Sequence, residues 1–272
     1  MFMLIIWLQG IWLPRHGYDF ARTPLWAGIY MLPLTAGFII AGPISGYLSD
    51  RYGARPFATA GMLTTALAFL LFQLLPVDFN YWEFAALLLV MGLSNGLFMS
   101  PNRAAVMNAL PVEHRGAGSG MFSTFQNSAQ VLSIGIFFSL MIVGLASSLP
   151  ASLYQGLVAH GVSGSDAGRV AHLPPVATLF AAFLGYNPMQ HLLGPGVIAR
   201  LPSAQAATLQ GRAFFPNLIS SPFQSGLHAA FDFAIVASLV AAVASWSRGR
   251  RHPVDLGPVE DDATSPAPAT SA

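Results

Sequence analysis

The feature that most constrains this chain is a set of apolar stretches, each long enough to cross a lipid bilayer. A bilayer core about 30 Å thick needs roughly 20 apolar residues in a helix. Charged residues make up only 8% of the 272 residues, which is too few to cover a soluble domain. Five stretches reach the required length or come close to it: 25–48, 57–75, 82–99, 122–145 and 227–246. The sequence therefore predicts an all-α, polytopic membrane protein.

The composition also excludes several kinds of chemistry. Cysteine and lysine are both absent, so the chain has no thiol nucleophile, no cysteine-ligated metal and no P-loop lysine for ATP. The seven histidines show no metal-ligand spacing. A net charge of +1 is too small for a protein that neutralises many phosphates, so we expect no nucleic-acid partner. We also expect no bound metal and no cofactor.

Residues 1–13 are strongly apolar but too short, at about 20 Å, to cross a bilayer as a helix. They lack the basic start and the cleavage site of a signal peptide, and they resemble the outer end of a span whose beginning is missing. Arginines gather in the loops at 50–56 and 102–118 and after residue 247, while the opposite short loops hold only Arg15 and Arg22. The positive-inside rule predicts a multi-pass protein of the cell membrane with its C-terminus in the cytoplasm.

Two segments depart from this compact plan. Residues 146–226 are rich in Ala, Gly, Pro and Ser, and we expect a long extracellular loop there. Within it, the apolar stretch 176–184 predicts an interfacial or re-entrant segment, with a plain loop as the alternative. Residues 248–272 are polar and rich in Pro, Ser, Thr and Ala, which predicts a disordered cytoplasmic tail after a membrane domain of residues 1–247.

The most informative motif lies between the second and third predicted spans. Its glycines allow a tight turn and a close helix approach, and its charges suit a helix start and a carboxylate or phosphate partner. The alternative is an ordinary positively charged cytoplasmic turn. The motif residues are Gly46, Leu48, Asp50, Arg51, Gly53 and Arg55.

These residues resemble, in order, the G-x-L-x-D-R-x-G-x-[RK] signature of the major facilitator superfamily. Residues 111–120 resemble the P-x-x-x-R-G-x-x-x-G segment that precedes the fifth helix of a facilitator half, and residues 41–46 are similar to a G-P-x-x-G element of drug:proton antiporters. A long loop before the last span is similar to the 14-span drug:proton antiporter branch. The resemblance covers roughly residues 1–250 and is to the C-terminal half.

The resemblance implies one six-helix bundle, with its first helix truncated, equivalent to one half of a facilitator fold. Such transporters hold their substrate between two bundles that rock about a midplane site. The signature loop is understood to hold the halves together, so Asp50 and Arg51 would contact a missing N-terminal half or a second chain. The implied partners are the lipid bilayer, protons and a lipophilic or cationic small molecule.

Polar residues within the predicted spans are candidates for lining a substrate cavity. Those of the fifth helix fall three and four residues apart on one face, and neutral amides can bind a ligand without a buried charge. Hydrogen bonds between helices are the alternative role. The first and fourth helices line the cavity in the family, which adds two more residues. The candidates are Gln9, Asn95, Gln126, Asn127 and Gln130.

His228 and Asp232 share one helix face in the last predicted span. The pair is open to several readings: an interfacial polar pair, a proton relay, half of a metal site, or a short acyltransferase motif. The family places this helix at the lipid-facing periphery, and we hypothesise that a coupling carboxylate belongs to the missing half.

The sequence thus predicts the C-terminal half of a proton-coupled drug or small-molecule efflux transporter, not an enzyme. The alternatives are a transport-incompetent remnant, a membrane interaction protein, and a small membrane acyltransferase built on His228 and Asp232.

Overall fold

A computed structural model describes residues 1–172, 174, 176 and 187–247. These residues form helices joined by short turns, and they include no β-strand. Among them, five helical segments are long and apolar enough to cross a membrane: Thr23–Tyr52, Ala54–Leu74, Tyr81–Met107, Val112–Ala159 and Phe214–Trp246. The predicted all-α polytopic membrane protein is confirmed.

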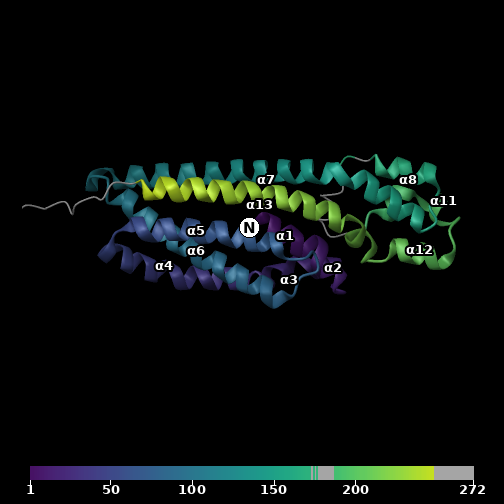
Figure 1. Ribbon diagram of the computed structural model, residues 1–272, viewed down its shortest axis with the longest axis horizontal. Helices are drawn as coiled ribbons and strands as arrows, with labels where there is room; N and C mark the ends of the chain where they lie inside the picture. Colours follow the sequence, from purple (N-terminus) through teal and green to yellow (C-terminus); the bar gives the residue numbers. More distant parts are fainter. Residues whose placement is uncertain (173, 175, 177–186, 248–272) are drawn as a thin grey trace, which may run out of the picture.

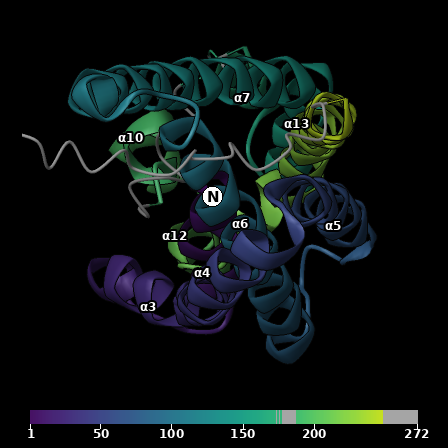
Figure 2. The ribbon, with the colours of Figure 1, turned by 90° about the vertical axis from the view of Figure 1, so that its left-hand side faces the viewer.

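The long helices are arranged side by side in an open arc (Figures 1 and 2). They are α4 (Leu32–Tyr52), α5 (Ala54–Leu74), α6 (Tyr81–Met107), α7 (Arg115–Ala159) and α13 (Phe214–Trp246), and the short α3 (Thr23–Tyr30) leads into α4. α4 packs on α6, α6 on α5, α5 on α13, and α13 on α7. α4 and α7 are therefore the two ends of the arc, and the side between them is left open by the described residues.

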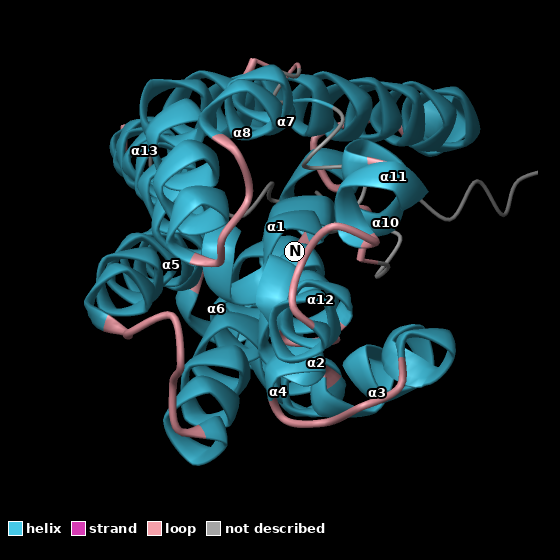
Figure 3. Ribbon diagram, turned by 90° about the vertical axis from the view of Figure 1, so that its right-hand side faces the viewer, coloured by secondary structure: helices cyan, strands magenta, loops and turns pink. Residues whose placement is uncertain are grey.

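The apolar segment at the start of the chain folds as one short helix inside this arc. It comprises α1 (Phe2–Ile6), a π-helical stretch (Trp7–Trp12) and α2 (Leu13–Arg15). Most of its apolar side chains are buried, and two indole N–H groups anchor it, Trp7 to the Val77 carbonyl at 3.3 Å and Trp12 to the Phe79 carbonyl at 3.0 Å. Figure 3 shows α1 ringed by the other helices. The segment is core structure, although it is shorter than the five spans.

Small residues bring α4 and α6 into backbone contact. A Cβ added to Gly92 would meet the backbone of Leu34 and Phe38 on α4, and one added to Gly96 would meet Ala41. The buried Ser45 hydroxyl donates to the Gly96 carbonyl at 2.9 Å. Because lipid supplies no hydrophobic drive between helices, such close packing and interhelical hydrogen bonds are what hold them together.

A single residue separates α4 from α5. Gly53 has φ +85°, in the left-handed region that favours glycine, and its N–H donates to the Ser49 carbonyl at 2.8 Å. Most of the predicted signature loop is therefore helical, and residues 46–55, named here the signature turn, form a tight corner between two spans.

The structure differs from the expected loop at 146–226. α7 continues without a break to Ala159, and α13 begins at Phe214 rather than at residue 227. The two extensions pack against each other through large apolar side chains. On each helix these side chains recur every four residues, so they lie on one face. The buried residues are Leu145, Leu149, Leu153 and Leu157 on α7, and Phe215, Ile219, Phe223 and Leu227 on α13.

Short helices close this end of the molecule: α8 (Gly164–Ala171), α10 (Met189–Leu193), α11 (Pro195–Ile198) and α12 (Ser203–Gln210). We name them, with the extensions 146–159 and 214–226, the cap; Figure 1 shows it at the right. Most of the predicted re-entrant segment 176–184, and the whole predicted tail 248–272, lie outside the described residues.

Candidate functional site

The first half of α7, at one end of the arc, carries three of the cavity candidates. Gln126, Asn127 and Gln130 are all exposed. In the most apolar 18-residue stretch of the span Val112–Ala159, only 11% of the residues are buried. In the corresponding stretches of α5 and α6, 44% are buried. A shallow groove of about 490 Å³ lies along this helix, lined by Asn127, Ser128, Val131 and Leu132. The three amides thus project from a membrane-spanning helix into space that the described residues leave unfilled.

The other two cavity candidates lie elsewhere. Gln9 is buried in the π-helical stretch, with 8% of its surface exposed. Asn95 is half-buried on α6, and its side-chain N–H donates to the Met91 carbonyl of its own helix at 3.0 Å. The structure therefore does not bring Gln9 and Asn95 onto the exposed face that carries the α7 amides.

The signature turn presents its charges at the opposite end of the bundle from the cap. Asp50 and Arg51 are exposed, and Asp50 makes no ion pair with any described residue. The Arg55 guanidinium lies over the Trp246 ring of α13, 4.2 Å from its centroid. Gly46 lies close to Ser100 of α6, and Leu48 is half-buried. Arg55 thus packs the signature turn against α13, whereas Asp50 and Arg51 remain exposed.

His228 and Asp232 are both on α13, but the described contacts do not join them. The Asp232 carboxylate accepts a hydrogen bond from the Gln73 amide of α5 at 2.7 Å, and it is exposed. His228 is half-buried. The carboxylate is thus tied to a neutral amide on the next helix of the arc.

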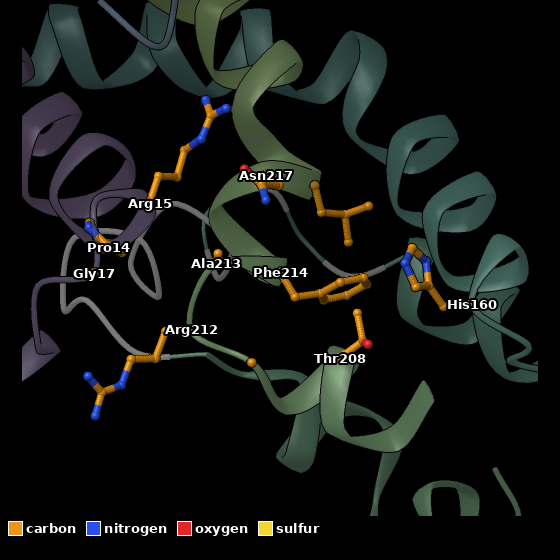
Figure 4. Close-up of a pocket in the computed structure, with 11 residues that line it drawn as sticks. Pro14, Arg15, Gly17, His160, Thr208, Arg212, Ala213, Phe214 and Asn217 are labelled. Atoms are coloured by element: carbon orange, nitrogen blue, oxygen red, sulfur yellow. The ribbon is translucent and has the colours of Figure 1, made fainter. Parts of the chain in front are cut away.

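Motif reasoning missed a hollow of about 770 Å³ between α2 and the cap. Its wall includes His160, Thr208, Phe214 and Leu218 (Figure 4). All four come from the segment that composition indicated to be a loop, so no motif pointed to them. Across the described residues no group of three or more His, Asp or Glu side chains is placed to hold a metal ion.

Comparison with known proteins connects this arrangement with a family of membrane transporters. The family model described as Major Facilitator Superfamily matches residues 1–134. Methyl viologen resistance protein SmvA of Salmonella typhimurium is 32% identical over 159 residues, which are 56% of this chain and 32% of that protein. The tetracenomycin C resistance and export protein of Streptomyces glaucescens is 24% identical over 277 aligned positions, covering 100% of this chain and 44% of that protein.

A third relative is the methylenomycin A resistance protein of Bacillus subtilis, 30% identical over 158 residues, which are 57% of this chain and 31% of that protein. The aligned part of this chain therefore covers less than half the length of each of these three relatives.

Proposed function

Since residues 1–134 match the Major Facilitator Superfamily model, we propose that this chain is the C-terminal six-helix half of a proton-coupled transporter of that family that exports drugs or similar small molecules. The family is one of transporters, and the chain is a multi-pass membrane protein. The proposal goes further on four points: the chain is the C-terminal half, protons are the coupling ion, transport is outward, and the substrate is a lipophilic or cationic small molecule.

The observation that carries the proposal is the exposed amide face of α7. Amide groups facing lipid without partners would cost several kcal/mol each. A second bundle, or a water-filled cavity between two bundles, removes that cost by supplying hydrogen-bond partners. Gln126, Asn127 and Gln130 are then the contacts that this half offers to a substrate.

Two further observations support the same reading. The relatives carry names of resistance and export, and each of the three is more than twice as long as its aligned part, which leaves room for a second bundle. Asp50 and Arg51 are exposed, as expected if their partner is a helix of the other half. The arginine-rich signature turn then lies on the cytoplasmic side of the cell membrane, together with the C-terminus. The cap lies on the extracellular side.

An immunoblot of native membranes, with an antibody against residues 248–272, tests whether the chain acts as a half. A band near twice the 28.9 kDa of this chain, or a 28.9 kDa band that co-purifies with a second membrane bundle, supports the proposal. A 28.9 kDa band without such a partner contradicts it and favours a transport-incompetent remnant or a membrane interaction protein.

The role of the amides is tested in the complete transporter by proton-driven efflux of methyl viologen. Replacing Gln130 or Asn127 by leucine removes one hydrogen bond to the substrate, so the apparent affinity should fall about fivefold. Gln210→Leu is the matched control, because it removes an exposed amide from the cap. Equal efflux in all three variants would refute a substrate-lining role for the α7 face.

A further inference from the structure

The hollow between α2 and the cap is a second place where a small molecule fits. Its volume of about 770 Å³ is within the range of drug-sized sites, which is about 300–1,000 Å³. Its lining includes Pro14 of α2, Gly17 just after that helix, His160 at the end of α7, and several residues between 211 and 218. The side chains of Phe214 and Leu218 give it an apolar surface, and Figure 4 shows the Phe214 ring pointing toward His160.

His160 supplies a hydrogen-bond acceptor at one end of this hollow. It caps the C-terminus of α7, with Nδ1 2.8 Å from the Gly156 carbonyl. A carbonyl only accepts, so Nδ1 carries the proton and, in the neutral ring, Nε2 keeps a free lone pair. The ring stands edge-on to Phe214, with 5.0 Å between the ring centroids. Among the described residues no partner occupies Nε2.

The Thr208 hydroxyl supplies a second acceptor close to His160. Thr208 uses its only proton to donate to the Ala204 carbonyl at 2.9 Å, so toward the hollow it offers lone pairs alone. With His160 Nε2, the Thr208 hydroxyl places two acceptors at the edge of the apolar surface, and the Asn217 side chain, which also lines the hollow, can both donate and accept. A ligand that binds at His160 and Thr208 brings its own donor.

Two arginines line the hollow, but their charge is compensated at its rim. Arg15 pairs with Asp78 at 3.7 Å, and Arg212 pairs with Asp19 at 3.6 Å. In Figure 4 both guanidinium groups point away from the space beside Phe214 and His160. No unpaired charge therefore faces that space, which favours a neutral ligand over an ion.

We propose that this hollow binds a neutral aromatic molecule bearing a hydroxyl or N–H donor, with its ring on Phe214 and Leu218 and its donor on Nε2 of His160. The site is separate from the amide face of α7. It does not depend on transport, because the residues that form it all lie in this chain. Failure of the efflux proposal would leave it standing, and the reverse also holds.

The first test changes the ligand and leaves the protein intact. Saturable binding of 2-naphthol to the chain in lipid nanodiscs is compared with binding of 2-methoxynaphthalene, with empty nanodiscs subtracted to remove partition into lipid. The two molecules share one ring system, and the hollow is large enough for the extra methyl group. Loss of the donor should weaken binding about fivefold. Absent saturable binding of 2-naphthol, or equal binding of both molecules, overturns the proposal.

The second test changes the protein. His160→Leu should weaken 2-naphthol binding about fivefold while leaving the methoxy analogue unaffected. His172→Leu is a matched control, since His172 caps α8 in the same way, with Nδ1 2.7 Å from the Gly168 carbonyl, and does not line the hollow. Circular dichroism establishes that both variants fold. Unchanged binding of 2-naphthol by folded His160→Leu, or an equal loss in His172→Leu, overturns the assignment of His160.

Discussion

Replacement of Gly92 by alanine is the sharpest test of how the arc is held together. The added Cβ would lie 2.9 Å from the carbonyl carbon of Leu34 and 3.0 Å from the amide nitrogen of Phe38, closer than real Cβ contacts allow. Both are backbone atoms, so no rotamer change relieves the overlap and α4 must move away from α6. Forcing an extra carbon into a packed site costs about 1–3 kcal/mol.

Gly42→Ala supplies the matched control on α4. A Cβ at Gly42 meets nothing within 4 Å, so this variant keeps the packing and gains about 0.5–1 kcal/mol of helix propensity. Gly92→Ala gains the same helix propensity, because Gly92 also lies inside a helix, so the two variants should differ in free energy of unfolding by about 1–3 kcal/mol. For a chain of this size each kcal/mol shifts the melting temperature by roughly 2–4 °C.

The assay is thermal unfolding of the purified chain in one detergent, followed by tryptophan fluorescence. Gly92→Ala should melt at least about 2 °C below Gly42→Ala. If Gly92→Ala melted at or above the temperature of Gly42→Ala, the backbone contact between α4 and α6 would be absent and the order of helices in the arc would need revision.

Two further contacts in the bundle are tested by substitution. Arg55→Leu and Trp246→Leu should each lower the melting temperature because they break one cation–π contact, worth about 0.5–2 kcal/mol. The double variant should lose less than the sum of the two single losses, and full additivity would contradict the contact. Trp12→Phe leaves the buried Phe79 carbonyl without its donor, at about 1–3 kcal/mol, whereas Trp82→Phe changes a side chain that is 77% exposed and should have no measurable effect in the same melting experiment.

The membrane spans were predictable because their signal is simple. A run of about 20 apolar residues has few alternatives, and the predicted span 57–75 differs from α5 by only a few residues. The single glycine corner at Gly53 was harder to foresee, because the motif does not reveal that residues 46–52 continue as helix.

The helices of the cap were not predicted, because the composition of residues 146–226 favours a loop more strongly than the spacing of the leucines favours a helix. Residues 146–159 contain Pro150 and several serines, which favour a loop, yet Leu149, Leu153 and Leu157 fall at the helical spacing of four. Pro150 is exposed in the structure, so its ring lies off the buried face. Once that stretch was assigned to a loop, nothing in the sequence placed His160 beside Phe214, which lies more than fifty residues away.

The partner of Asp232 was not predicted for a similar reason. Helical spacing puts both residues on one face of α13, but it carries no information about the neighbouring helix. Gln73 of α5 reaches the Asp232 carboxylate across that interface. A proton-relay role for His228 and Asp232 stays a prediction. The roles of the α7 amides and of Asp50 stay predictions as well.

The length of α7 has a mechanical consequence. Its 45 residues make a rod about 67 Å long, more than twice the thickness of a bilayer core. Beyond the predicted span 122–145, the leucine face of α7 packs against α13. This packing resists bending of α7 where the helix leaves the lipid. A change in tilt of about 10° about the membrane centre would swing the far end, roughly 35–50 Å away, through about 6–9 Å. A small rearrangement at the amide face is thus amplified into a displacement of the cap that is larger than one helical turn.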